Sequence, residues 1–226
     1  MKKLFIILFS LVCFTSFGFA QWSMGLSVGP DYSHYNYDVQ WAYDFRLKSY
    51  WGVAMEVPLS YAVNDWFSIK SGVSFQERGY CLLRSHQYSK YSELNRQDLF
   101  LSLPIEAVFS FGGRKLKGFF NAGGYVSYWL CSKYYGYELS ATLFSQLFSE
   151  DKEFEKGVDN RLELGCVGGI GIDYAYSEQW SFIADVQLYY ALSDQHKDYQ
   201  SMRFPANYRN FLFQMGLVYH FKKSKV

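Results

Sequence analysis

The stretch LELGCVGGIGIDY, residues 162–174, decides the fold class, because its side chains alternate between two faces. One face is mostly apolar and consists of Leu162, Leu164, Cys166, Gly168, Ile170, Ile172 and Tyr174. The other face is small or acidic apart from one valine, and consists of Glu163, Gly165, Val167, Gly169, Gly171 and Asp173. A period of two indicates a β-strand with one apolar face, whereas an amphipathic helix repeats its apolar residues every three or four positions.

The same period of two recurs on either side of this stretch. It is clearest in Trp51–Tyr61 and in Leu99–Phe109. Followed along the chain, it predicts eight strands, at residues 22–34, 50–61, 67–80, 98–110, 118–132, 161–174, 180–192 and 208–221.

The connections between these strands alternate in length. The long connections are polar and rich in tyrosine, at residues 35–49, 81–97, 133–160 and 193–207. The short ones carry turn residues, at 62–66, 111–117 and 175–179. Long loops at one end and tight turns at the other are typical of outer-membrane barrels. The pattern predicts an all-β fold: an eight-stranded antiparallel up-and-down transmembrane β-barrel with four long outer loops, three short periplasmic turns and both termini in the periplasm.

A soluble eight-stranded barrel of the lipocalin type is the main alternative, because its strands alternate in the same way. However, charged residues make up only 19% of the chain. The polar face consists largely of small residues, among them Gly25, Ser27, Gly72, Ser74, Gly123, Ser127, Gly165, Gly169, Gly171 and Gly216. A solvated face would carry more lysine and glutamate, whereas a narrow barrel interior needs small side chains.

Aromatic residues, 21% of the chain, gather near both ends of the expected strands. Those at the turn end are Trp22, Tyr61, Trp66, Phe67, Phe109, Tyr176, Trp180, Tyr219 and Phe221. Those at the loop end are Tyr50, Trp51, Tyr80, Trp129, Tyr190 and Phe211. Two aromatic girdles around an apolar band are typical of a barrel that crosses a bilayer. Outer-membrane lipid is therefore an expected partner.

Two prolines, Pro58 and Pro104, fall inside expected strands. Proline has no N–H to donate to a neighbouring strand. Each is therefore expected to mark a bulge or a local break in the ladder.

Residues 1–20 have the order of a secretory signal peptide. Lys2 and Lys3 are followed by the apolar run Leu4–Phe14 and by Gly18-Phe19-Ala20, which approximates a cleavage site. The alternative, a transmembrane anchor, would need a longer apolar run. We expect a signal peptide at 1–20 and a barrel domain at 21–226.

The last expected strand ends in QMGLVYHF, residues 214–221. Gln214 and Gly216 share the inward face, and Tyr219 and Phe221 share the outward face. This spacing resembles the C-terminal signal by which the barrel assembly machinery of the outer membrane recognises its substrates. An ordinary amphipathic strand that ends in aromatic residues is the alternative.

Three stretches resemble the PorT-like outer-membrane β-barrel proteins of Gram-negative bacteria. Phe100–Pro104 is similar to the family's aromatic-Leu-Glu-Ile-Pro strand, with Ser102 where a glutamate is usual. Asn121–Tyr125 resembles its glycine-aromatic strand, and Tyr190–Asp194 its Tyr-x-x-Gly-Leu strand end without the glycine. The resemblance implies a small barrel of the OmpA and OmpX type and no particular activity.

Eight polar or charged residues of the strands project inward by parity: Glu56, Lys70, Arg78, Glu106, Glu163, Asp173, Asp185 and Gln214. A network of internal ion pairs would satisfy them in a barrel too narrow for water flow. The alternative is a path for protons or ions.

No catalytic residue, metal site or cofactor is predicted. The histidines are His34, His86, His196 and His220. Lipid-modifying barrels use a Ser-His-acid site near the outer rim, but no spacing here fixes a serine and a carboxylate beside a histidine. Cysteine and histidine spacings do not match a metal site. A formal charge of +1 argues against nucleic acid as a partner.

Three cysteines follow the expected signal peptide: Cys81, Cys131 and Cys166. The strand pattern sets Cys131 and Cys166 on opposite faces of neighbouring strands, which disfavours a disulfide between them.

Leucines and phenylalanines recur at four-residue spacing in the third long loop, at Leu139, Leu143, Phe144, Leu147 and Phe148. The spacing predicts a short amphipathic helix there. Taken together, the sequence predicts a non-enzymatic structural or surface-interaction scaffold with an unidentified surface or envelope protein partner. The alternatives are a small channel or accessory subunit of a secretion or uptake complex, and a lipid-modifying enzyme.

Overall fold

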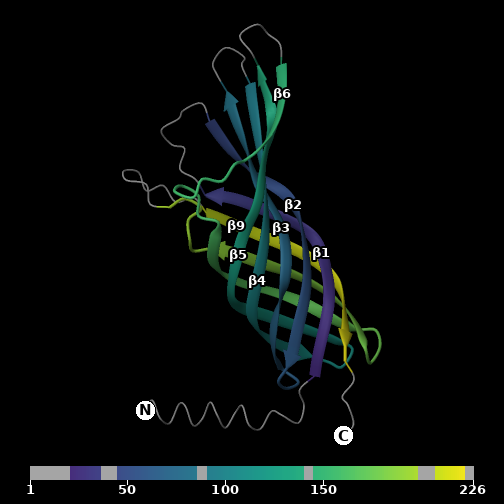
Figure 1. Cartoon of the computed structure of the whole chain (residues 1–226). Helices are drawn as coiled ribbons and strands as arrows, with labels where there is room; N and C mark the ends of the chain where they lie inside the picture. The colour runs from purple at the N-terminus through teal and green to yellow at the C-terminus, as the bar shows by residue number, and fades with distance from the viewer. Residues whose placement is uncertain (1–20, 37–44, 86–90, 140–144, 198–206, 222–226) are drawn as a thin grey trace.

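A computed structural model describes residues 21–36, 45–85, 91–139, 145–197 and 207–221 (Figure 1). The described chain forms nine β-strands: β1 (Gln21–Asn36), β2 (Phe45–Ala62), β3 (Phe67–Ser85), β4 (Tyr91–Gly112), β5 (Leu116–Leu139), β6 (Ser145–Asp151), β7 (Leu162–Ala175), β8 (Trp180–Ala191) and β9 (Asn207–His220). Within these ranges, no helix is long and apolar enough to cross a membrane.

Eight of the strands close into a ring. Their order is β4-β3-β2-β1-β9-β8-β7-β5, and β4 also pairs with β5. All neighbours are antiparallel, and the first and last strands meet along pairs such as Ser27–Gly216. The predicted eight-stranded up-and-down barrel is confirmed. Closure removes the open sheet edge, whose unpaired N–H and C=O groups a bilayer could not satisfy.

The ninth strand, β6, lies outside the ring and pairs with the outer end of β5, from Lys133–Asp151 to Leu139–Ser145. With the outer ends of β2, β3, β4 and β5 it forms a sheet that extends beyond the barrel, which we call the outer sheet (Figure 1). Much of what the sequence predicts as long loops is therefore strand. For example, residues 91–97 and 133–139 belong to β4 and β5.

The prediction of a short amphipathic helix around residues 139–148 is wrong. Leu147 and Phe148 lie in β6, and Leu139 ends β5, while Leu143 and Phe144 lie outside the described residues. A helix this short has too few hydrogen bonds to offset the cost of its first turn. Pairing with the neighbouring β5 strand satisfies the backbone instead.

The two faces of the barrel wall differ as the alternation predicts. On β9 the burial alternates residue by residue, with Phe211, Phe213 and Met215 outward and Leu212 and Gln214 inward. Outward side chains are large and apolar, and Ile105 is 66% exposed and Met215 72% exposed. Such a surface is unfavourable in water and favourable in lipid.

The prolines interrupt the ladder without changing its register. Bridges are missing opposite Pro58, between the pairs Met24–Leu59 and Ser27–Glu56. They are also missing opposite Pro104, between Ser71–Ile105 and Ser74–Ser102. The expected local breaks are thus present, because proline cannot donate to the neighbouring strand.

Two register shifts lie elsewhere, between Ser49 and Ala54 on β2 and between Leu99 and Phe100 on β4. Each proline was expected to mark either a bulge or a local break in the ladder, and only the break occurs at the prolines.

Two aromatic residues assigned to the loop-end girdle point inward instead. Trp129 is 0% exposed, and Tyr80 packs against the same interior cluster. Trp129 shares the parity of Tyr125 and Ser127, which also face inward, and it packs in the interior cluster with Tyr35, Phe100 and Tyr208.

At the opposite end the strands are joined by tight turns (Figure 1). The first and last described segments meet there, since Phe221 N donates to Trp22 O. The β4–β5 turn is closed by a hydrogen bond from Gly113 N to Leu116 O of 3.0 Å. Gly112 in this turn has φ +123°, a conformation that residues with a Cβ rarely adopt.

Candidate functional site

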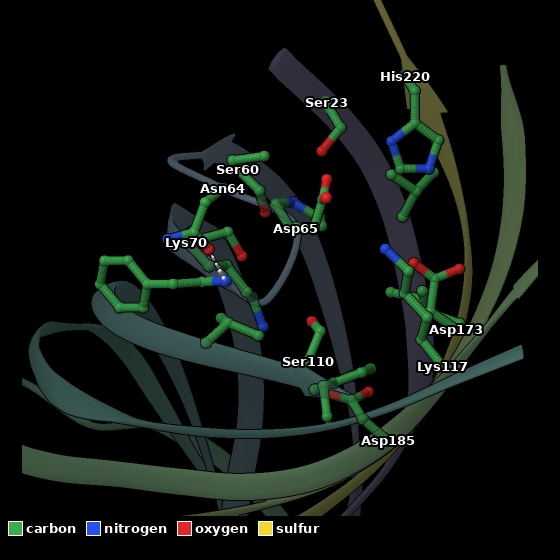
Figure 2. Close-up of a pocket in the computed structure, with 18 residues that line it drawn as sticks. Ser23, Ser60, Asn64, Asp65, Lys70, Ser110, Lys117, Asp173, Asp185 and His220 are labelled. Carbon is green, nitrogen blue, oxygen red and sulfur yellow. Dashed lines mark hydrogen bonds between the residues drawn. The ribbon is translucent and has the colours of Figure 1, made fainter. Parts of the chain in front are cut away.

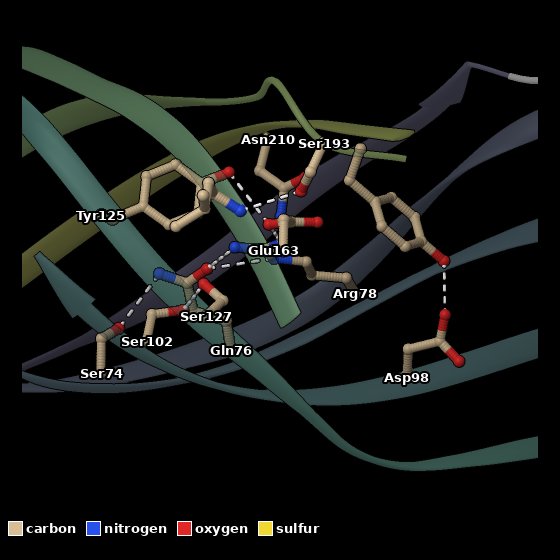
Figure 3. Close-up of polar contacts among 12 residues, drawn as sticks. Ser74, Gln76, Arg78, Asp98, Ser102, Tyr125, Ser127, Glu163, Ser193 and Asn210 are labelled. Carbon is tan, nitrogen blue, oxygen red and sulfur yellow. Dashed lines mark hydrogen bonds and ion pairs between the residues drawn. The ribbon is translucent and has the colours of Figure 1, made fainter. Parts of the chain in front are cut away.

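The middle of the barrel is occupied by one buried ion pair and the polar groups around it. Arg78 Nη1 lies 2.6 Å from Glu163 Oε1, and the two residues are 0% and 3% exposed. Tyr125 donates to the same carboxylate at 3.0 Å, and Gln76 accepts from Arg78 Nε at 3.1 Å (Figure 3). The guanidinium lies over the ring of Phe100, 4.6 Å from its centroid. The arginine thus connects β3 to β7 across the interior.

Smaller polar side chains complete this layer. The hydroxyl groups of Ser102 and Ser127 lie 2.6 Å apart, and Gln76 Nε2 donates to Ser74 Oγ at 3.1 Å (Figure 3). Asn210 Nδ2 donates to Asp31 Oδ2 at 3.1 Å on the opposite wall. Polar groups from all these strands therefore contact one another across the interior, although Asp31 Oδ1, Glu163 Oε2 and Asn210 Oδ1 keep no hydrogen-bond partner.

Towards the outer end, an aromatic cluster fills the interior. Its buried members are Tyr35, Phe100, Trp129 and Tyr208. Arg96 Nε donates to Asp98 Oδ1 at 2.9 Å beside this cluster, and the Tyr208 hydroxyl donates to Asp98 Oδ2 at 2.7 Å. The cluster and its ion pair close the barrel above the Arg78 layer.

Two outer segments, residues 152–161 and 192–197, join over this cluster. Asn160 N donates to Gln195 O at 2.7 Å, and Asp159 forms an isolated bridge with His196. Lys152 Nζ lies 2.8 Å from both carboxylate oxygens of Asp159. Burial alone would raise the pKa of Asp159, but the hydrogen bonds from Lys152 and from the Glu155 amide lower it. Burial lowers the pKa of His196, and Arg96 lowers it further.

The half of the interior nearest the turns holds a second charged group. Lys70 Nζ lies 3.1 Å from Glu56 Oε1 and 3.3 Å from Glu106 Oε1. Asn121 donates to the other oxygen of Glu106. Asp185 lies nearby and accepts a hydrogen bond from Gln187.

Between this group and the turns lies a cavity of about 240 Å³, which we call the turn-end cavity. Its lining residues are drawn in Figure 2. Lys70 and Asp185 are buried and form the deep side, whereas Lys117, Asp173 and His220 are less buried and lie nearer the turns, at the mouth. Serines and Asn64 complete the polar side of the lining. In contrast to the packed outer half, this end of the interior has room for a small molecule.

The structure places the eight candidate interior residues on the inner wall. Seven are buried, with exposures from 0% to 9%: Glu56, Lys70, Arg78, Glu106, Glu163, Asp185 and Gln214. Asp173 lies at the mouth of the turn-end cavity and is only partly buried. The ion pairs among them form two separate groups, Arg78 with Glu163 and Lys70 with Glu56 and Glu106, instead of a single network.

Several interior polar residues lie beyond the set that the sequence identifies: Asp31, Gln76, Arg96, Asp98, Gln187 and Asn210. The alternation of faces along the strands could have identified some of them. Gln76 lies on the same strand face as Arg78, and Gln187 lies on the same strand face as Asp185. Arg96 had no such signal, since it falls in a segment expected to be a loop.

The C-terminal residues lie where barrel closure occurs. Gln214 is buried, and a Cβ on Gly216 would lie 2.4 Å from Ser27 Oγ, so glycine allows the close approach of β1 and β9. Tyr219 packs edge-on against Trp180 with ring centroids 5.0 Å apart. Phe221 N donates to Trp22 O at 2.9 Å, and its side chain is 45% exposed.

The histidines lie at both ends of the barrel. His34 Nδ1 lies 3.2 Å from Ser49 Oγ at the outer end, and His220 Nε2 lies 2.9 Å from Ser181 Oγ near the turns. His86 lies outside the described residues. No group of three or more histidine, cysteine or acidic residues in the described ranges could hold a metal ion.

The expectation that Cys131 and Cys166 lie on opposite faces is wrong, since both are exposed on the outer surface. The two are nevertheless far apart along the strands, because Cys166 pairs with Gly124, well before Cys131 on β5. Cys81, Cys131 and Cys166 are all free thiols.

A family model described as "Outer membrane protein beta-barrel domain" matches residues 16–197. The chain belongs to this family. It is therefore an outer-membrane β-barrel protein of the Gram-negative type, as the apolar outer wall and closed ring require. No curated protein matches the chain.

Several solved barrels are similar in structure. Neisserial surface protein A, from Neisseria, has a TM-score of 0.48 and 13% identity, over 89% of this chain and 99% of that one. OprG of Pseudomonas aeruginosa has a TM-score of 0.49 and 11% identity, over 90% and 96%. Ail, the attachment invasion locus protein of Yersinia pestis, has a TM-score of 0.42 and 13% identity, over 88% and 98%. The family assignment itself rests on the family model.

Proposed function

We propose that this outer-membrane barrel is a closed, non-enzymatic scaffold that presents its outer sheet to a partner on the cell surface or in the envelope. The observation that carries the proposal is that the interior is packed at the outer end while the strands continue beyond the ring. The outer sheet lies above a closed barrel, so it does not contribute to conduction, but it offers a surface for contact with a partner.

The closed interior supports the scaffold over a channel. Arg78 and its partners cross the middle of the barrel, and Phe100, Trp129 and Tyr208 pack above them. An aqueous pore would need a continuous polar lumen, which generally requires more strands than eight.

The outer sheet supports contact with a partner. Within the described residues, β6 pairs with β5 alone, so its other edge is open. An open edge carries unpaired N–H and C=O groups that can accept an extended segment of another protein. Leu147 on this edge is 82% exposed, and an apolar side chain at such a position favours association.

We further propose that the chain is a member of the PorT-like group and that both of its termini lie in the periplasm. We also propose that the barrel assembly machinery recognises its last strand. The motifs at Phe100–Pro104 and at residues 214–221 support them, as does the position of both described ends beside the short turns.

The first experiment separates the scaffold from the alternative of a small channel or accessory transport subunit. Protein extracted from outer membranes is inserted into planar lipid bilayers, and the current is recorded. We expect no stepwise conductance above that of detergent alone. Reproducible single-channel steps would contradict the closed interior and favour the channel.

The second experiment examines the outer sheet in intact cells. A photo-crosslinking residue is introduced at Leu147, and at Leu192 as a matched control, since Leu192 is an outer leucine that is 64% exposed and lies outside the outer sheet. We expect discrete crosslinked products at position 147 and not at 192. Equal labelling at both positions, or none at either, would argue against the outer sheet as the contact surface.

A further inference from the structure

The deep end of the turn-end cavity holds more carboxyl groups than basic groups. The Lys70 ammonium lies 3.1 Å from Glu56 and 3.3 Å from Glu106, and both carboxylates are 1% exposed. Asp185, 6% exposed, also interacts electrostatically with Lys70. Three buried carboxylates therefore share one buried ammonium. Buried carboxylates are costly unless a positive charge or a hydrogen-bond donor compensates them.

All three carboxylates have an oxygen without a hydrogen-bond donor, and of the three only Asp185 lines the cavity. Asp185 is part of the cavity wall (Figure 2). Its Oδ2 accepts a hydrogen bond from Gln187, whereas its buried Oδ1 has no donor. Asp65 and Asp173 add two further carboxylates to the lining, against Lys117 as the second cation. The cavity wall thus holds three carboxyl groups against two lysines, and one of these carboxyl groups is incompletely satisfied.

The rest of the lining limits the kind of cation that fits. No group of acidic residues in the described ranges is arranged to hold a metal ion. Apolar side chains, among them Phe67, Val108, Phe119 and Ile183, line the cavity together with the polar ones. A volume of about 240 Å³ suits a molecule of several heavy atoms better than a bare ion.

We propose that the turn-end cavity binds a small organic cation: a primary ammonium group on a short hydrocarbon stem. The ammonium donates to carboxylate oxygens of the lining, those of Asp185 and Asp173 among them, because it has three N–H donors and no acceptor. The stem packs against the apolar lining, and the ligand enters from the turn end, where the cavity opens. This site is independent of the outer sheet, so its failure would leave the proposed scaffold role intact.

Binding is tested with putrescine as the probe and 1,4-butanediol as its uncharged match. Isothermal titration calorimetry is performed on protein extracted from outer membranes in detergent. We expect putrescine to bind and butanediol not to bind. Asp185→Asn should weaken putrescine binding by at least about tenfold, since it removes the negative charge that pairs with the ammonium and turns one acceptor oxygen into an N–H donor.

The control is Glu153→Gln, which removes an exposed carboxylate from an outer loop and should leave putrescine binding unchanged. If Asp185→Asn does not fold, as judged by heat-modifiable gel migration, Asp173→Asn at the cavity mouth replaces it, with a smaller expected loss. Absence of putrescine binding to the wild type would mean that protons compensate the carboxylates, and would overturn the proposal. An equal loss in the Glu153→Gln control would also overturn it, since binding would then be nonspecific.

Discussion

At the scale of single residues, the Arg78–Glu163 ion pair is the interior contact whose loss should cost the most stability. The arginine is 0% exposed, and among the described residues Glu163 is the carboxylate within ion-pair distance of it, at 2.6 Å. Glu163→Leu should therefore destabilise the barrel by about 3–5 kcal/mol, because it leaves a buried charge without its partner. The measurement is the urea-unfolding midpoint of the barrel in lipid vesicles.

Glu153→Leu serves as the control for this variant, since Glu153 is exposed and its loss should change stability by less than about 0.5 kcal/mol. Glu106→Leu should fall between the two, because Lys70 keeps Glu56 as a partner. Equal midpoints for Glu163→Leu and Glu153→Leu would mean that the ion pair does not hold the middle of the barrel together.

Parity along the strands accounts for what the sequence could predict about this interior. It identified Glu56, Arg78 and Glu163 as inward because a strand has only two faces. It could not say which partners meet, since that depends on the relative stagger of strands far apart in sequence. Arg78 and Glu163 are brought together across the barrel by β3 and β7, whose pairing partners are other strands.

At the scale of elements, β9 closes the barrel against β1 and carries the proposed assembly signal. Phe221 follows the strand directly, and its ring packs edge-on against Tyr219 with centroids 5.2 Å apart. Phe221→Ala should lower the amount of assembled barrel in cells while barrels refolded in vitro remain nearly normal. The expected defect concerns recognition, because an exposed ring contributes little to packing. The readout is the folded fraction on gels of unboiled samples.

Met215→Ala is the matched control, since Met215 is an outward residue of the same strand and is 72% exposed. It should assemble at the wild-type level. If Phe221→Ala also assembles at that level, the run at residues 214–221 is an ordinary strand end.

Sequence patterns are least informative for the strands of the outer sheet. The membrane-spanning parts of the strands were predictable to within a few residues, because one face must be apolar throughout. The outer sheet was not, since its strands lie beyond the bilayer and are no longer constrained to alternate. Leu147 and Phe148 fit a helical spacing as well as a strand, and only pairing with β5 decides between them.

At the scale of the whole molecule, the two ends of the barrel differ in structure. Tight turns and both described ends of the chain lie at one end, and the outer sheet and the joined segments 152–161 and 192–197 lie at the other. An assembling barrel must move its connections across the bilayer, and short turns are the connections that remain on the side from which the chain enters. The difference in length made it predictable from the sequence that the short turns lie at one end and the long connections at the other, but not that the long connections form a sheet.

This asymmetry predicts which connections are accessible from outside the cell. The same epitope tag is inserted after Gly157, in the outer segment, or after Gly113, in the β4–β5 turn. Both sites are exposed, and a Cβ at Gly157 would have no neighbour within 4 Å, so insertion should be tolerated. Antibody should label the Gly157 tag on intact cells, and both tags only after the outer membrane is permeabilised. Labelling of the Gly113 tag on intact cells would reverse the orientation, and with it the side from which the turn-end cavity is filled.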